Sequence, residues 1–214
     1  EQVQRQVPRR DRRHRAQRRA QRVVEPGLAV VRLAGELGRR VREEAFDMVR
    51  CEPLLGGLVH SSLLHHSTLE RALAYRFSLK LASGEMSEQI LREIADEAYA
   101  AAPELGQSAR ADVTAVFDRD PACLRFIQPI LFFKGYQAVQ AYRIGHWLWM
   151  QGRKDLASFV QMRVAEVFGV DIHPAARVGK GLMIDHAHSI VIGETAVVGD
   201  NVSMLHSVTL GGTG

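Results

Sequence analysis

The sequence predicts an α+β protein, in which an all-helical amino-terminal domain is followed by the first coils of a parallel β-helix. Between about residues 30 and 169, apolar side chains return every three or four positions, the spacing of amphipathic helices. After Gly169 they return every six positions, which neither an α-helix nor a simple strand can place on one side. We therefore expect a basic leader over 1–30, a helical domain over 31–168 and an incomplete β-helix over 169–214.

The net positive charge of the chain comes from its first 24 residues. The 214 residues carry a net charge of +4, with 46% hydrophobic and 24% charged residues, as in an ordinary globular protein. Residues 1–24 hold nine arginines against two acidic residues, whereas the rest of the chain has three more acidic than basic residues. Because blocks of like charge are usually solvated tails, we expect a disordered leader and no nucleic-acid partner.

Cysteine content and hydropathy indicate a cytoplasmic protein without a membrane span. Cys51 and Cys123 are too few to form a disulfide framework in a chain of this length, which favours a reducing compartment. The most apolar segment, 127–150, is interrupted by three basic side chains and cannot cross a bilayer.

Five helical segments follow from apolar spacing and from start and stop signals. One opens with Ser67-Thr68-Leu69-Glu70, a capping box in which the Ser67 and Glu70 side chains would each satisfy a free amide at the helix start. Two others stop ahead of prolines, which cannot continue a helix. The predicted segments are 31–49, 67–79, 87–101, 133–151 and 156–168.

A repeat of six residues begins at Ile172, with a two-residue slip after Ile184. Four of its seven apolar positions are followed directly by glycine, which suits the tight corners of a triangular coil whose interior the apolar side chains fill. At about 18 residues a turn, the chain holds roughly two and a third turns. The repeat positions are Ile172, Val178, Ile184, Ile192, Val198, Met204 and Leu210.

Several runs carry a family resemblance that covers about residue 37 to the last residue. In the repeat they are DIHPAA at 171–176, IDHA at 184–187, IGETA at 192–196 and VTLGGTG at 208–214. In the helical part they are CEP at 51–53, DRDPA at 118–122, and KGYQA and AYRIGHWLW within 134–149. Together they resemble the serine O-acetyltransferases, a family of hexapeptide-repeat acyltransferases. The resemblance implies a left-handed β-helix and acetyl transfer from acetyl-CoA, as co-substrate, to the L-serine hydroxyl, giving O-acetylserine for cysteine biosynthesis.

Such a transfer needs a group that removes the hydroxyl proton. Histidine suits this task because its pKa lies near neutral, and a carboxylate on the other ring nitrogen fixes the tautomer. Asp171 and His186 lie fifteen residues apart, so a triangular coil could bring them together. By resemblance, His186 is the base and Asp171 its orienting partner. No activated serine or cysteine stands out, so we expect direct attack by the substrate.

The resemblance also implies the binding residues. It places the serine ammonium at Asp120 and Asp185, with Pro121 beside them. It places coenzyme A at Gly211, Gly212 and Thr213. Each of these has a structural alternative, since Asp before Pro forms turns, Asp can satisfy corner amides and glycine suits corners.

One departure from the family bears on the choice of histidine. After Asp185-His186-Ala187 the family often has a small or hydroxyl residue and then glycine, whereas this chain has His188 and Ser189. His206 is a further candidate for the base, although its repeat position indicates an outward side chain.

The resemblance implies an assembly as well. It predicts a homo-oligomer, a trimer or a hexameric dimer of trimers, with active sites between neighbouring β-helices. It also predicts that the full-length form binds O-acetylserine sulfhydrylase through a tail. That tail, further coils and an Arg-His pair for the substrate carboxylate are absent from this sequence, so we expect a carboxy-terminally truncated form with little or no activity alone.

Two other classes of protein remain open. A zinc enzyme similar to gamma-class carbonic anhydrase would use histidines as ligands, but its expected pair five positions apart is missing, and we expect no metal. A non-catalytic assembly protein would use the helices for oligomerisation alone. The ligands of the zinc enzyme would be His173, His186, His188 and His206.

A separate histidine cluster, His60, His65 and His66, lacks companion ligands and is expected in a core or interface.

Overall fold

The computed structural model describes residues 26–211, and of residues 26–34 the backbone alone. Residues 1–25 of the expected basic leader therefore lie outside the described residues. Contacts divide the chain into two units. The first, residues 1–35, is described only as the start of helix α2, and the second, residues 36–214, holds every later element.

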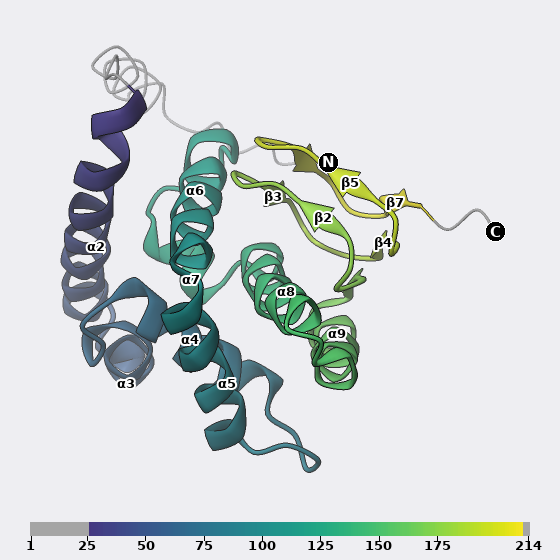
Figure 1. The fold of residues 1–214 in the computed structure, drawn as a ribbon. Helices are drawn as coiled ribbons and strands as arrows, with labels where there is room; N and C mark the ends of the chain where they lie inside the picture. The colour runs from purple at the N-terminus through teal and green to yellow at the C-terminus, as the bar shows by residue number, and fades with distance from the viewer. Residues whose placement is uncertain (1–25, 212–214) are drawn as a thin grey trace, which may run out of the picture. The chain divides into compact units, whose positions relative to one another are not determined.

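Helices account for most of the chain as far as Phe168, in agreement with the predicted helical pattern (Figure 1). The first begins at Pro26, ahead of the predicted start at Val31. Two short elements, α3 and α7, and the long helix α6 were not among the predicted segments. The helices are α2 (Pro26–Cys51), α3 (Gly56–Val59), α4 (Leu69–Leu81), α5 (Glu88–Ala101), α6 (Pro103–Arg119), α7 (Ile127–Leu131), α8 (Lys134–Met150) and α9 (Lys154–Phe168), with a 3-10 turn η1 (Pro53–Leu55) and a π-helical turn η2 (His60–Leu64).

The start of α4 differs from the predicted capping box. Thr68, not Ser67, is the N-cap, and its side chain accepts a hydrogen bond from the amide of Arg71 at 3.3 Å. The Glu70 carboxylate bonds the Arg110 guanidinium of α6, at 2.5 Å. The prediction was wrong because it could not foresee that α6 supplies a charged partner to Glu70.

After α9 the chain forms short parallel strands. Gly169 ends the helix in left-handed conformation, with φ of 68°, which glycine adopts without strain. The strands form three parallel sheets with the orders β1-β4-β7, β2-β5 and β3-β6. The strands are β1 (Val170–Ile172), β2 (Arg177–Val178), β3 (Met183–Ile184), β4 (Ile190–Ile192), β5 (Val197–Val198), β6 (Ser203–Met204) and β7 (Thr209–Leu210).

The strand register confirms the six-residue repeat and its slip. Ile172 pairs with Ile192, and Val178 pairs with Val198, so these neighbours lie 20 positions apart. Ile192 pairs with Leu210, only 18 positions on. The first turn therefore contains three repeats plus two extra residues, and the second contains three repeats. The predicted fold class, a helical domain followed by the first coils of a parallel β-helix, is confirmed.

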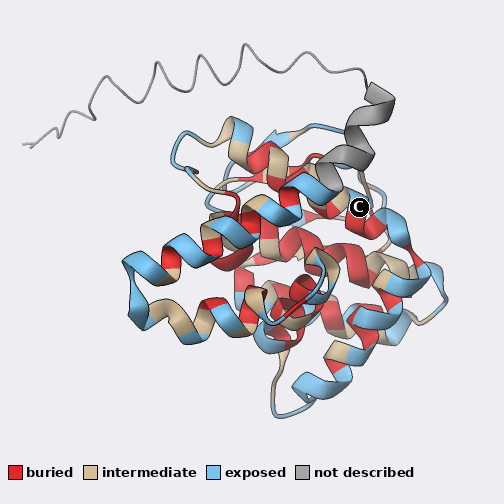
Figure 2. Ribbon diagram, turned by 90° about the vertical axis from the view of Figure 1, so that its left-hand side faces the viewer, coloured by how far each residue is buried: buried red, intermediate tan, exposed pale blue. Residues whose placement is uncertain are grey.

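One continuous core joins the coils to the helices that pack on them. In the coil interior, Ile184 and Ile192 are 5% and 1% exposed, and they belong to the same cluster as Leu148 of α8 and Val160 of α9. The buried segments follow the inner sides of the helices in Figure 2. Since a fully buried aliphatic side chain stabilises by about 1.5–3 kcal/mol, this shared core fixes the first coil against α8 and α9.

Candidate active site

His186 lies on a corner of the β-helix, residues 185–189, between β3 and β4. Three non-glycine residues of this corner have left-handed backbone, with φ of 58° at His186, 46° at Ala187 and 54° at Ser189. Such backbone costs a non-glycine residue roughly 1–2 kcal/mol. The surrounding structure must therefore hold the corner in place, as is common at functional sites.

Contacts with α8 and with the next coil hold this corner. A β-carbon on Gly135, in the first turn of α8, would overlap the carbonyl oxygen of Ile184 and lie 3.1 Å from the Ala187 side chain, so the helix start packs directly on the corner. From the next coil, the carbonyl oxygen of Met204 accepts the Asp185 amide at 2.9 Å. The helical domain and the second coil thus fix the backbone that carries His186.

The imidazole of His186 is accessible and lies beside a carboxylate. Its side chain is 72% exposed, and its Nε2 lies 3.8 Å from Oδ2 of Asp185. The other oxygen, Oδ1, accepts the His186 backbone amide at 2.8 Å, which orients the carboxylate. The ring of His206, one turn further along the β-helix, lies 6.0 Å from the His186 ring, centroid to centroid. An exposed histidine with a half-buried carboxylate is suited to proton transfer.

Asp171, the predicted partner of His186, has a different neighbour in the single chain. It lies in β1 between the buried residues Val170 and Ile172, so its side chain faces out of the coil. There its Oδ1 accepts a 2.6 Å hydrogen bond from Nε2 of Gln161 in α9. Within the described part of the chain, no hydrogen bond or ion pair joins Asp171 to His186.

Asp120 caps the carboxyl end of α6. Its amide donates to the Val116 carbonyl at 2.9 Å, and its Oδ1 accepts the amide of Ala122 at 2.7 Å. This contact is the turn-forming role that the sequence analysis gave as the structural alternative for Asp120. It uses only one of the two carboxylate oxygens. The following Pro121 is exposed.

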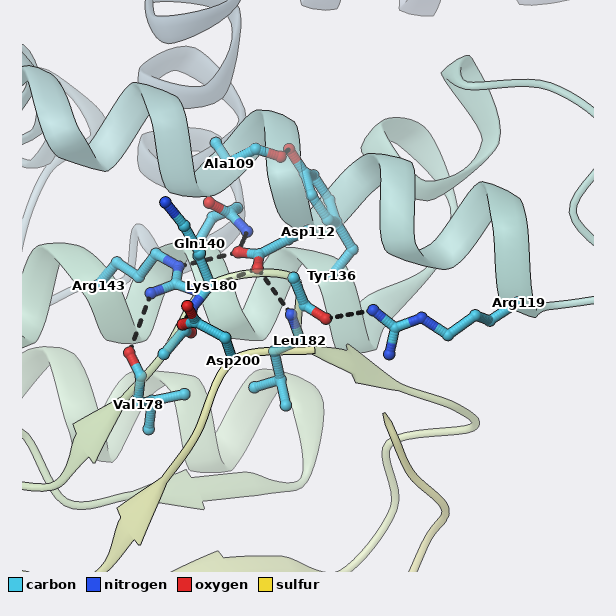
Figure 3. A network of polar contacts seen from close by, with 12 residues as sticks. Ala109, Asp112, Arg119, Tyr136, Gln140, Arg143, Val178, Lys180, Leu182 and Asp200 are labelled. Carbon is cyan, nitrogen blue, oxygen red and sulfur yellow. Dashed lines mark hydrogen bonds and ion pairs between the residues drawn. The ribbon is translucent and has the colours of Figure 1, made fainter. Parts of the chain in front are cut away.

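The helical domain is tied to the first coil by polar side chains of α8 (Figure 3). Arg143 donates to both oxygens of Asp112, which α6 supplies, and also to the Gly179 carbonyl at 2.8 Å. Tyr142 donates to the carbonyl of Ala176 at 2.5 Å. Burial raises the pKa of Tyr142 to about 12, so its hydroxyl remains a donor at neutral pH.

Of the three predicted coenzyme A residues, Gly211 is the one that the structure describes. Gly211 has a φ of 79°, consistent with the corner role left open by the sequence. Gly212 and Thr213 lie outside the described residues.

The histidines proposed as zinc ligands do not form a metal site in the described part of the chain, where no three His, Cys, Asp or Glu side chains are grouped to hold an ion. His173 instead accepts the amide of Ala175 on Nδ1, at 3.1 Å. In the cluster of His60, His65 and His66, His66 is 8% exposed and its Nε2 donates to the Ser61 carbonyl at 2.9 Å.

Sequence reasoning missed the residues that support the site. Arg119 and Arg143 stood within runs that resemble the family, but no role was assigned to them. Asp112 was not singled out. One signal was available: Asp112 and Arg119 are seven positions apart, the spacing that places two side chains on one face of a helix.

The comparisons with known proteins agree with each other. A family model described as "Serine acetyltransferase, N-terminal" matches residues 38–141. The serine acetyltransferase of Salmonella typhimurium is 52% identical over 176 residues, which are 82% of this chain and 64% of that protein. A crystal structure of the Brucella abortus serine acetyltransferase in complex with coenzyme A is 47% identical, with a TM-score of 0.82, over 84% of this chain and 72% of that one. Soybean serine acetyltransferase complexed with serine is 44% identical, with a TM-score of 0.83, over 85% and 75%.

Fold and site together define a hexapeptide-repeat protein whose β-helix follows a helical domain and carries an accessible histidine on a coil corner. Within that class, the chain belongs to the serine acetyltransferase family. It spans about 64% of the length of the first curated relatives that it matches.

Proposed function

We propose that the protein containing this chain is an acetyltransferase that moves the acetyl group of acetyl-CoA to the hydroxyl of L-serine. The observation that carries the proposal is the accessible imidazole of His186, with a carboxylate 3.8 Å from Nε2, on a corner fixed by the helical domain. Relatives of the same fold have been solved with coenzyme A and with serine.

The reaction needs one base and no covalent enzyme intermediate. His186 accepts the proton of the serine hydroxyl while the oxygen attacks the thioester carbonyl carbon. The carbon–sulfur bond then breaks, the sulfur receives the proton from His186, and the products are O-acetylserine and free coenzyme A. A positioned base of this kind contributes about 10²–10⁴ in rate.

We divide the carboxylates between two tasks. Asp120 and Asp185 bind the serine ammonium, with Pro121 beside them, and Asp171 orients the imidazole. The free oxygen of Asp120 supports the first task. The second requires Asp171 and His186 to come together, with Gln161 giving up its hydrogen bond. Gly211, Gly212 and Thr213 approach coenzyme A.

We propose that the protein acts as a trimer or a dimer of trimers in the cytoplasm, in cysteine biosynthesis, and that O-acetylserine sulfhydrylase is its partner. Support for self-association comes from apolar side chains on the outside of the coils: Val191, Val197 and Leu205 are 42%, 62% and 57% exposed. In the part of the chain that the structure describes, no helix combines the length and apolar character needed to cross a membrane.

The test is a thiol-release assay on the intact protein with acetyl-CoA and serine. We expect serine-dependent release of free thiol, and a loss of about 10²–10⁴ in kcat for His186→Asn. His206→Asn is the matched control, because its ring lies against the same site from the next coil. Serine-independent thiol release, or a His206 variant that loses as much as the His186 variant, would contradict the proposal.

The two carboxylate tasks are separated by the same assay. Asp171→Asn should lower kcat with little change in KM for serine, whereas Asp185→Asn should raise that KM. If the two effects are exchanged, Asp185, which already lies beside the ring, is the orienting group.

A further inference from the structure

We propose that Arg119 is a positioning residue for serine binding, because it fixes Asp120, one proposed ammonium ligand, against the coils that carry Asp185, the other. The inference rests on the proposed function. The observation that supports it is a set of hydrogen bonds from the Arg119 guanidinium to two successive coils of the β-helix.

Arg119 is the last residue of α6 and spans both coils at one corner. Its Nη2 donates to the carbonyl of Gly181, in the first coil, at 2.6 Å. Its Nη1 lies within hydrogen-bond distance of three acceptors in the second coil: the carbonyls of Asn201 and Val202, at 3.0 and 3.2 Å, and the Ser203 hydroxyl, at 2.7 Å. Carbonyl and hydroxyl oxygens in two stacked coils thus converge on one side chain.

The acceptor corner is itself rigid. Gly181 has a φ of 73°, and a β-carbon there would overlap the Asn201 side chain, so the two coils are in close contact. The Asn201 amide also donates to the carbonyl of Lys180 at 2.8 Å. Arg119 therefore binds a preformed surface, and its position is set by the coils.

Asp112 completes the attachment. It lies two turns before Arg119 on α6, and its Oδ1 accepts the amide of Leu182 at 2.9 Å. The amide N–H and the carbonyl of the same Gly181–Leu182 peptide unit are thus bound by two residues of one helix (Figure 3). This arrangement fixes both the position and the rotation of α6 on the first coil.

The attachment links the two proposed ammonium ligands. Asp120 directly follows Arg119, and Asp185 follows Gly181 by four residues, through strand β3. A strand advances about 3.3 Å per residue. The path from Asp120 through Arg119 and Gly181 to Asp185 is therefore short, and its backbone is fixed by the hydrogen bonds described above. Within the described residues, Oδ2 of Asp120 has no hydrogen-bond partner and is available to a ligand.

Loss of Arg119 should therefore weaken serine binding selectively. Asp112 would still anchor the middle of α6, but the carboxyl end of the helix would be released and Asp120 would lose its fixed distance to Asp185. Coenzyme A is proposed to bind at 211–213, beyond the second coil, and its contacts should change little. A displacement of about 1 Å can cost up to about 10²-fold in enzyme efficiency.

The experiment compares Arg119→Ala and Arg119→Lys with Tyr142→Phe. Tyr142 is the matched control because its hydroxyl also ties the helical domain to the first coil, at the Ala176 carbonyl. We expect Arg119→Ala to raise KM for serine about tenfold or more and KM for acetyl-CoA less than about twofold. Arg119→Lys should be intermediate because an ammonium cannot span the four acceptors. Tyr142→Phe should change neither constant.

Serine dissociation constants, measured by calorimetry on the same proteins, separate this inference from the proposed function. A wild-type protein that binds serine without acetylating it overturns the proposed reaction, and the ratio of dissociation constants still decides the role of Arg119. Equal affinity in wild type and Arg119→Ala, or equal weakening in Arg119→Ala and Tyr142→Phe, overturns the positioning role. A wild-type protein that neither binds nor acetylates serine overturns both.

Discussion

Arg143 and Asp112 form a bidentate ion pair in the interior, between helices α8 and α6. Nε of Arg143 lies 2.8 Å from Oδ2 of Asp112, and Nη2 lies 3.0 Å from Oδ1. The side chains are 8% and 0% exposed. Gln140 and the Leu182 amide donate to the same carboxylate, at 2.9 Å each, so its charge is well satisfied. A buried charge that is so fully paired becomes costly when one partner is removed.

Arg143→Met should therefore be strongly destabilising, since it leaves the Asp112 carboxylate buried without its cation. We expect the free energy of unfolding in urea to fall by about 3–5 kcal/mol. Arg153→Met is the control, because Arg153 pairs with Glu97 at 2.8 Å on the surface, where both side chains are exposed. That variant should lose less than about 1 kcal/mol. Similar losses of unfolding free energy in the two variants would show that burial of the ion pair does not determine the cost of removing its cation.

Gly135→Ala should disturb the corner that carries His186. The added β-carbon overlaps the Ile184 carbonyl oxygen, which is backbone and cannot rotate away, so α8 or the corner must shift. We expect a loss of about 1–3 kcal/mol in stability and a fall in kcat in the thiol-release assay.

Gly38→Ala is the matched control for that substitution. Gly38 lies in α2, and a β-carbon added there would have no atom within 4 Å. Alanine at this position should be neutral or should stabilise by about 0.5–1 kcal/mol, because glycine is a poor helix residue. An unchanged kcat in Gly135→Ala would mean that the corner does not need the close approach of α8.

The coils could be predicted from the sequence because their rule is local. The repeat positions from Ile172 to Leu210 lie on the short strands and turn their apolar side chains toward the interior of the coil, and the slip after Ile184 is visible as two extra residues. The same holds for most helices, whose apolar spacing depends on the helix alone.

The support of the site could not be predicted, because it depends on which surfaces meet. Arg119 binds carbonyls that lie 62 to 83 positions away along the chain. Nothing in the local sequence distinguishes it from an arginine that makes no such contacts. Asp171 shows the same limit: a spacing of fifteen residues predicts a contact with His186, but it gives no sign that α9 places Gln161 beside this carboxylate in the single chain. Long-range polar contacts follow from tertiary packing, which no local pattern encodes.

The cap of α4 gives a test of local sequence reasoning. Thr68→Ala removes the side chain that accepts the Arg71 amide and should cost about 1 kcal/mol of stability. Ser67→Ala, which alters the residue that the capping-box pattern selects, should cost less than about 0.5 kcal/mol because Ser67 is exposed. Thermal unfolding of the two variants decides between the residues, and a larger loss for Ser67→Ala would restore the original capping box.

His66 should make the helical domain less stable in mild acid. Burial lowers the pKa of His66 below its usual 6.5, and the positive charge of Arg92 lowers it further. The folded state therefore binds fewer protons at this site than the unfolded chain, so the contribution of His66 is complete above about pH 6.5 and is lost as the pH falls through the lower, folded-state pKa.

We expect the unfolding midpoint of the wild type to fall more steeply between about pH 7 and pH 5 than that of His66→Gln. Glutamine has an amide that can replace the donor to the Ser61 carbonyl and does not titrate. His60→Gln is the control, because it removes an exposed histidine from the same segment and should keep the wild-type slope. If His66→Gln also keeps that slope, the acid sensitivity arises elsewhere in the chain.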